Sequence, residues 1–234
     1  FFFSPNIDLL QYIRMAKIHI AMKEFAEAQK IMDKACKLRQ YATCWLGFAV
    51  ACYHKTTPDL SLVENSLQQA SILDSRNAEV WGMITLNCMQ QAGDITAESP
   101  EFEIKMNEAL FAFRQALMYG LSLDESFPTE ISILEQIAVR FEKYQKYGPA
   151  SEALRRAFYT VRGISTSTRL LRLFVAVDVI SNDHNKDEMI DTLDRAIMCL
   201  DAPGIDREGL RKSMQKYAHD LQKKSLKERR SHHE

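Results

Sequence analysis

The residues best suited to metal binding or nucleophilic catalysis are six histidines and five cysteines, spread through 234 residues. Thiolates and imidazoles hold zinc when they recur at short spacings such as CxxC or HExxH. Neither pattern occurs here, and the phosphate-binding GxxxxGK[ST], the dinucleotide-binding GxGxxG and the esterase GxSxG patterns are absent as well. The sequence therefore predicts no catalytic residue, no metal site, no cofactor and no enzyme activity.

The cysteines and the paired histidines fit plainer roles. Cys36, Cys44, Cys52, Cys88 and Cys199 are odd in number and scattered, which indicates reduced thiols in a cytosolic compartment. His232 and His233 stand side by side near the end of the chain, where weak adventitious metal binding is all they suggest.

Composition indicates a globular helical protein. Hydrophobic residues make up 46% and charged residues 26%, and the net charge of −1 gives no general attraction to nucleic acid or an anionic membrane. Eight glycines and six prolines are few for a protein built from sheets and tight turns. No apolar run is long enough to span a membrane. The opening FFFSPNID lacks the features of a signal peptide and an initiator methionine, so we expect a piece of a longer chain.

Five stretches of the sequence share one pattern, in which a small or apolar residue is followed four later by a large apolar one and three later by alanine. Steps of four and three keep these residues on one face of a helix. The matching triplets are Ala28/Met32/Ala35, Val63/Leu67/Ala70, Ala109/Phe113/Ala116, Ala150/Leu154/Ala157 and Met189/Leu193/Ala196. The alanine predicts a close approach of a neighbouring helix.

A second pattern lies about twenty residues before each triplet and tests the first. It consists of a bulky residue, an apolar one three later and then a small one, and both tryptophans of the chain occupy the bulky position. The sets are Tyr12/Met15/Ala16, Trp45/Phe48/Ala49, Trp81/Ile84/Thr85, Leu134/Ile137/Ala138 and Leu173/Ala176/Val177. The two patterns together predict tandem helix–turn–helix units.

These units resemble the tetratricopeptide repeat, a helix–turn–helix of about 34 residues with the pattern W-x2-L-G-x2-Y…A-x3-F…A. His19 falls on the usual tyrosine position, so we expect a hydrogen-bonded packing residue there and no ligand. The resemblance implies an all-α, right-handed superhelical solenoid, and a generic all-helical bundle is the alternative. We place the five repeats near 9–41, 42–77, 78–123, 131–164 and 170–203, within an array at 1–204.

Two irregularities interrupt the repeat pattern, one inside the third repeat and one between the third and fourth repeats. About twelve extra residues fall near 93–105, and Ser99-Pro100 reads as the cap and first residue of a helix running to about Tyr119. Its protruding end is a candidate docking edge, and a tolerated surface loop is the alternative. The stretch GLSLDESFPTE (120–130) predicts a slight kink between the third and fourth repeats.

The last segment, 205–234, predicts a capping helix with a basic tail. Leu210, Met214, Tyr217 and Leu221 form one apolar stripe that would cover the end of the array. From residue 206 onward there are nine Lys and Arg against five Asp and Glu, a local charge of +4. An acidic partner for this tail is one interpretation, with nucleic acid less favoured, and a solvated helix face is the other.

First helices of such repeats line a concave groove, which suits an amphipathic helix or an extended segment of a partner protein. The alternative is that the parent chain fills its own groove. The expected wall is mostly apolar in the first three repeats and turns polar in the fourth. It comprises Ile13, Lys17, Ile20, Leu46, Val50, Tyr53, Gly82, Leu86, Met89, Glu135, Val139 and Glu142.

A narrower resemblance covers about residues 40–137. The stretches WLGFAVACY, NSLQQASILDSRNAEVW and ALFAFRQALMYGLSLDESFPTEISILEQI, in this order, are similar to the C-terminal repeats of axonemal cilia- and flagella-associated proteins. The insertion and the residues beyond 140 depart from that pattern. The resemblance implies a scaffold in the axonemal cytoskeleton that docks on microtubule-associated, dynein or central-apparatus proteins. A repeat subunit of an RNA-processing or trafficking complex, and a regulatory domain of an enzyme encoded elsewhere in the parent chain, are the alternatives.

Overall fold

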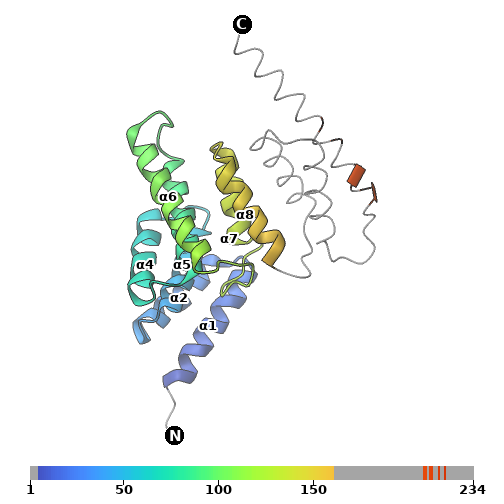
Figure 1. The fold of residues 1–234 in the computed structure, drawn as a ribbon. Coiled ribbons are helices and arrows are strands. Elements are labelled where there is room, and N and C mark those ends of the chain that lie inside the picture. Colours follow the sequence, from blue (N-terminus) through green and yellow to red (C-terminus); the bar gives the residue numbers. More distant parts are fainter. Residues whose placement is uncertain (1–4, 161–207, 210, 213–215, 217–218, 220–234) are drawn as a thin grey trace. The chain divides into compact units, whose positions relative to one another are not determined.

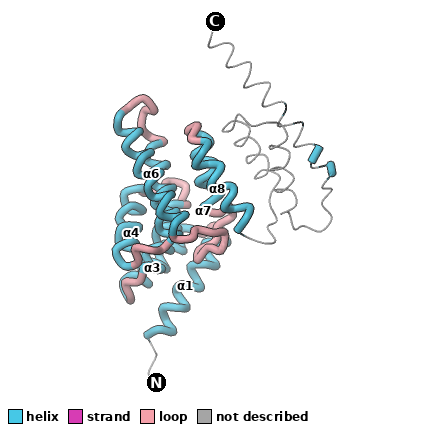
Figure 2. The backbone as a smooth tube through the Cα atoms, in the orientation of Figure 1, coloured by secondary structure: helices cyan, strands magenta, loops and turns pink. Residues whose placement is uncertain are grey.

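The computed structural model describes residues 5–160 together with 208–209, 211–212, 216 and 219. The described part is helical and contains no strand (Figures 1 and 2). Its helices are α1 (Pro5–Ala21), α2 (Phe25–Leu38), α3 (Ala42–Tyr53), α4 (Leu60–Leu73), α5 (Ala78–Ala92), α6 (Pro100–Met118), α7 (Ile133–Lys143) and α8 (Tyr147–Thr160). None of these helices is both long and apolar enough to cross a membrane.

The chain divides into two compact units, residues 1–133 and 134–234. In the first unit, helices pair in sequence order: α1 packs on α2, α3 on α4, and α5 on α6. Each pair also contacts the next, through α2 with α3 and α4 with α5, and the first helices of the pairs adjoin one another. This succession of hairpins confirms the all-α repeat fold and rules out a bundle in which helices far apart in sequence share one centre.

The alanine triplets are buried in the four described hairpins. Every member of the first four triplets is buried, from Ala28 in α2 to Ala157 in α8. Because an alanine adds almost no width to a helix, the partner helix can approach closely at these points. The fifth repeat (170–203) and the capping segment (205–234), with the domain boundary between them, lie outside the described residues apart from isolated positions. The right-handed superhelical course stays a prediction.

Two hairpin turns use a residue in the left-handed backbone conformation. Lys23 (φ 62°) follows α1, and Gln145 (φ 58°) follows α7. In both turns the next residue's N–H reaches back five residues, Glu24 to the His19 carbonyl and Lys146 to the Phe141 carbonyl, at 2.8 Å. This arrangement satisfies carbonyls at the helix end and reverses the chain within three residues.

Helix α6 begins where the sequence predicts. The Ser99 hydroxyl accepts a hydrogen bond from the Phe102 N–H at 3.2 Å, and Pro100 occupies the first helical position. The insertion therefore lengthens α6 at its N-terminus to 19 residues. The result confirms the predicted helix from Pro100, which ends at Met118, one residue before the expected Tyr119.

Removing this cap is expected to weaken α6. Ser99→Ala leaves an N–H of the first turn without its acceptor and should lower the free energy of unfolding by about 1 kcal/mol. Chemical denaturation of the two proteins measures the difference. Ser71→Ala is the matched control, because the Ser71 hydroxyl is exposed and bonds only a carbonyl of its own helix. An equal loss in both variants would contradict a capping role.

Candidate functional site

The expected partner-binding wall lies on α1, α3 and α5, and most of it is buried. Leu46, Val50 and Tyr53 in α3 are inaccessible, as are Leu86 and Met89 in α5 and Ile20 in α1. The Tyr53 hydroxyl donates to the Leu86 carbonyl at 3.4 Å, and this hydrogen bond joins α3 to α5. These side chains are therefore packed within the chain, and their contact with a partner stays a prediction.

Residues 120–132, which we name the cover segment, lie with Ile133 at the start of α7 against α3 and α5, at Gly47 and Gly82. Gly120 (φ +89°) follows the C-terminal cap of α6, and the Leu121 N–H donates to the Ala116 carbonyl at 2.9 Å. A left-handed residue at this position reverses the chain, and glycine adopts it without strain. The segment that leaves α6 in this way returns over α3 and α5. The predicted kink between the third and fourth repeats stays a prediction.

Two glycines make room for the cover segment, Gly82 of the expected wall and Gly47, which follows the wall residue Leu46. A Cβ atom on Gly47 in α3 would lie 2.5 Å from the Phe127 ring, and one on Gly82 in α5 would lie 2.7 Å from an Ile133 methyl group. Phe127, Leu121 and Ile133 are themselves buried. The backbone of two helices therefore touches the apolar side chains of the cover segment directly, in the place where a partner's side chains were expected.

Polar contacts hold the cover segment on either side of these apolar contacts. The Glu79 carboxylate in α5 accepts hydrogen bonds from the Ser126 N–H at 2.8 Å and from the Ser126 hydroxyl at 2.7 Å. The Lys17 ammonium lies 5.7 Å from the centre of the Phe127 ring, and the Lys23 ammonium pairs with Glu130 at 2.6 Å. Helix α1 with its turn and helix α5 thus make polar contacts with the segment, although the exposed Lys23–Glu130 pair adds little.

Two carboxylates influence each other where the cover segment lies against α5, Glu125 in the segment and Glu79 in α5. Burial raises the pKa of Glu125 to about 8, although the Ile133 N–H donates to it at 2.5 Å, and the charge of Glu79 adds to the rise. Burial also raises the pKa of Glu79, against the opposing effect of the Ser126 hydrogen bonds and the Lys17 charge. Sequence reasoning did not find this pair, because neither carboxylate lies in a recognisable motif.

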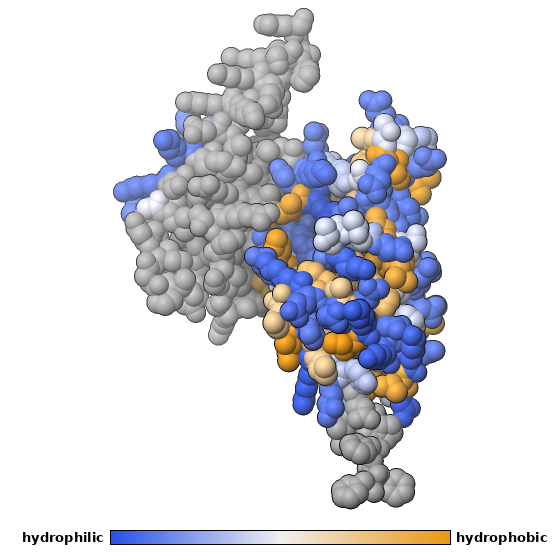
Figure 3. Space-filling model, turned by 180° about the vertical axis from the view of Figure 1, so that it is seen from behind, coloured by the Kyte–Doolittle hydropathy of each residue, from blue (hydrophilic) through white to orange (hydrophobic). Residues whose placement is uncertain are grey.

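Only part of the expected wall is accessible. Ile13 is half-buried and Lys17 exposed in α1, while Glu135, Val139 and Glu142 are half-buried in α7 of the second unit. Seen from behind the view of Figure 1, the described surface carries apolar residues as separate patches among hydrophilic ones (Figure 3). A continuous apolar channel is not seen on this face.

The chemistry-bearing side chains of the described residues do not form a catalytic site. Cys36, Cys44, Cys52 and Cys88 are buried free thiols. Burial raises the pKa of the Cys36 and Cys52 thiols to about 12 and that of Cys88 to about 11, so they stay protonated and unreactive at neutral pH. No group of three or more potential metal-binding side chains gathers within the described part. His19 bonds Glu24 at 2.6 Å, which confirms the predicted hydrogen-bonded role.

Comparison with known proteins agrees with the repeat fold. The family model "Cilia and flagella-associated protein 70 C-terminal domain" matches residues 3–197. Cilia- and flagella-associated protein 70 of Macaca fascicularis is 33% identical over 105 residues, which are 43% of this chain and 10% of that protein. The Homo sapiens protein of the same name is also 33% identical over 105 residues, 43% of this chain and 9% of its own length. The matching region thus spans about a tenth of these relatives.

One solved structure has a weaker likeness. The crystal structure of the APC/C hetero-tetramer Cut9–Hcn1 aligns with 90% of this chain and 42% of its own chain, at 13% identity and a TM-score of 0.38. A score this low carries no argument about fold or function.

Proposed function

Because the chain belongs to the family of the cilia and flagella-associated protein 70 C-terminal domain, we propose that it is a non-enzymatic, protein-binding scaffold module of the ciliary or flagellar axoneme. The observation that carries the proposal is the match of this family over residues 3–197, on an array of stacked helical hairpins. Arrays of this kind present extended surfaces to other proteins. The protein then works in the cytoplasm, in the cytoskeleton of the cilium or flagellum.

The site geometry supports binding over chemistry. The buried thiols are protonated at neutral pH. The Glu79 carboxylate accepts hydrogen bonds from Ser126 of the cover segment, and the Glu125 carboxylate of that segment accepts one from the Ile133 N–H. A catalytic pair would instead face a cleft that substrate can enter. In the first unit the place of an expected ligand is taken by the chain's own Phe127 and Leu121.

The partner surface follows from what the cover segment leaves accessible. We expect Ile13 and Lys17 on α1, and Glu135 and Glu142 on α7, to be the wall residues that reach a partner without rearrangement. The others, from Ile20 and Leu46 to Met89, would meet a partner only after the cover segment had moved away. For the basic segment 205–234, an acidic protein partner stays a prediction, and neither a membrane nor nucleic acid is required.

Localisation of the parent protein tests this function. With a fluorescent tag on the full-length protein in ciliated or flagellated cells, we expect signal along the axoneme that persists after detergent removes the membrane. Deleting residues 5–160 should shift most of the protein to the detergent-soluble fraction. The same protein carrying Ser71→Ala, an exposed position in α4, is the matched control and should stay with the axoneme.

Other cellular distributions of the tagged protein would contradict the proposal. A diffuse cytoplasmic or nuclear signal from the parent protein would contradict the axonemal proposal and favour a repeat subunit of an RNA-processing or trafficking complex. Retention of the deletion variant in the axoneme would show that this module is not what attaches the protein.

A further inference from the structure

A second concave feature lies on the opposite face of α5 from the cover segment. It is a cavity of about 260 Å³ between α4, α5 and α6, which Figure 1 shows next to one another. Trp81, Ile84 and Cys88 line it from α5, whereas Gly82, Leu86 and Met89 face the other way. Sites for small ligands measure about 300–1,000 Å³, so this volume suits one or two side chains better than a metabolite.

The walls of the cavity are apolar, and one aromatic pair is held rigidly. The Trp81 indole N–H donates to the Ser75 carbonyl at 2.8 Å, and the Phe111 ring meets the indole edge to face, with centres 6.0 Å apart. Leu67 and Ala112 complete the apolar lining from α4 and α6. An indole face of this kind attracts a cation as well as an alkyl chain.

The charged side chains that line the cavity are acidic. They are the carboxylates Glu64 and Glu108, of which Glu64 accepts from the Gln91 amide at 2.9 Å and Glu108 pairs with Lys105 at 2.8 Å. Asn87 is 2% exposed; its Nδ2 makes one long contact of 3.4 Å with the Leu60 carbonyl, and its Oδ1 has no hydrogen-bond partner within the described part. A buried amide oxygen without a donor is costly. A donor that enters beside Asn87 would remove that cost.

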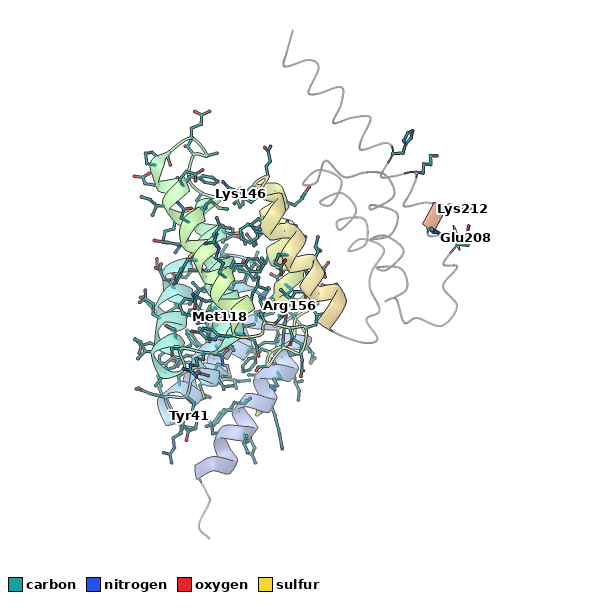
Figure 4. The ribbon with its side chains drawn as sticks, viewed as in Figure 1. Tyr41, Met118, Lys146, Arg156, Glu208 and Lys212 are labelled. Carbon is teal, nitrogen blue, oxygen red and sulfur yellow. The ribbon has the colours of Figure 1, made fainter. Side chains whose placement is uncertain are left out.

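An exposed apolar stripe runs along α6 beside the cavity. Ile104, Phe111 and Met118 are 57%, 56% and 64% exposed, and large apolar side chains that gather on one surface indicate an interaction site. Their seven-residue spacing places them almost in line along one side of the helix. The stripe runs from Ile104 in the added N-terminal turns to Met118 at the C-terminal end of α6, about 21 Å at 1.5 Å per residue (Figure 4).

We propose that an amphipathic α-helix of another protein docks along α6, with apolar side chains at seven-residue spacing on this stripe and one arginine or lysine in the cavity. The spacing identifies a helix, because an extended segment would match a repeat of two. The hydrogen-bond acceptors identify the basic residue. Its stem would pack on Trp81, and its head would donate to the Asn87 Oδ1 and reach the Glu64 carboxylate, whereas the Glu108 carboxylate already pairs with Lys105. The inference rests on the proposed scaffold function and names its partner's chemistry.

Site-specific photo-crosslinking in the full-length protein tests the proposal. A benzophenone amino acid replaces Ile104, Phe111 or Met118 in turn, in ciliated or flagellated cells, and the crosslinked peptides are sequenced. We expect all three positions to capture one stretch of one partner, with attachment sites about seven residues apart and a Lys or Arg near the Phe111 attachment. The same group at Lys30 and Lys37, which are exposed on α2, gives the background.

A cavity variant separates recognition from folding. Asn87→Leu replaces an unsatisfied amide with an apolar group of similar size, so the Tm should be unchanged or higher. Loss of one hydrogen bond to a charged donor should lower the crosslink yield at position 111 about tenfold. An unchanged yield would overturn the role of the cavity.

The remaining outcomes distinguish this inference from the scaffold function. Crosslinks from the stripe to residues 161–234 of the same chain, or to partner stretches without the heptad spacing or the basic residue, would overturn it. If the stripe stays at background while the same group at Met15 or Ile18 on α1 captures a partner, the inference fails and the scaffold function stands. Background crosslinking at all these positions would count against both.

Discussion

Phe127→Ala lowers the free energy of unfolding by about 3 to 5 kcal/mol, the range expected when a fully buried phenylalanine is truncated. The Phe127 side chain is 2% exposed although it lies in a loop between two helices. Its ring fills the space over Gly47 and lies near the Lys17 ammonium, and alanine would leave a cavity there. Chemical denaturation measures the change. Phe111→Ala is the control, because that ring is mostly exposed and should cost about 1 kcal/mol or less.

A double-mutant cycle shows whether Phe127 really lies against α3. Gly47→Ala alone should be destabilising, because the added methyl group would lie 2.5 Å from a rigid ring, whereas the neighbouring Met32 side chain can move aside. In the Phe127→Ala background the clash is gone, and the same substitution should become stabilising by about 0.5 to 1 kcal/mol, the usual preference for alanine over glycine in a helix. A stabilising Gly47→Ala in the wild-type background would mean that the cover segment does not lie on the wall.

This packing also bears on how the module binds partners. A cover segment held by Phe127, Leu121 and the Glu79–Ser126 hydrogen bonds would have to be removed before a partner could fill the same groove. A partner would then have to offset several kcal/mol of buried contacts. The accessible ends of the wall and the stripe on α6 require no such displacement, so they are the more favourable places for a first contact.

The helices could be predicted from the sequence because their signals are local. The triplet ending at Ala35, like the three that follow it, needs only the 3.6-residue period to be recognised, and all four described triplets are buried. Ser99-Pro100 is an equally local signal, and α6 begins there. One position departs from the pattern, because Met15 is exposed.

The path of the cover segment could not be predicted, because it depends on contacts far apart in the sequence. GLSLDESFPTE reads locally as a break, and nothing in it specifies that Phe127 packs on a residue eighty positions earlier. One feature of the sequence did indicate a close contact, although not the segment that makes it. Gly47 and Gly82 lie inside helices, where glycine costs about 1 kcal/mol of stability relative to alanine. A glycine inside a helix despite this cost indicates that another group approaches its backbone closely. The cover segment and Ile133 make that approach at Gly47 and Gly82.

The second large effect concerns pH. The pKa of Glu125 is about 8 in the folded protein and near 4.5 when the chain is unfolded, so the folded state binds the proton more tightly. Its contribution to stability is therefore complete below pH 4.5 and is lost as the pH rises through 8. The loss is of the order of 4 kcal/mol over that interval. The raised pKa of Glu79 acts in the same direction. We expect the protein to unfold more readily at pH 8 than at pH 5.

Glu125→Gln should remove most of this dependence and stabilise the protein at pH 8 by about 2 to 4 kcal/mol. Glutamine keeps an oxygen that can accept from the Ile133 N–H, and it carries no charge to repel Glu79. Denaturation curves at pH 5 and pH 8 give the difference directly. Glu130→Gln, at the exposed end of the same segment, should leave the slope between these two pH values unchanged, because the Lys23 ammonium lowers the pKa of Glu130 from its usual value, away from this interval. If Glu125→Gln lowers the free energy of unfolding by the same amount at pH 5 and at pH 8, the Glu125 carboxyl is not buried between the cover segment and α5. The packing of the segment described above would then be wrong.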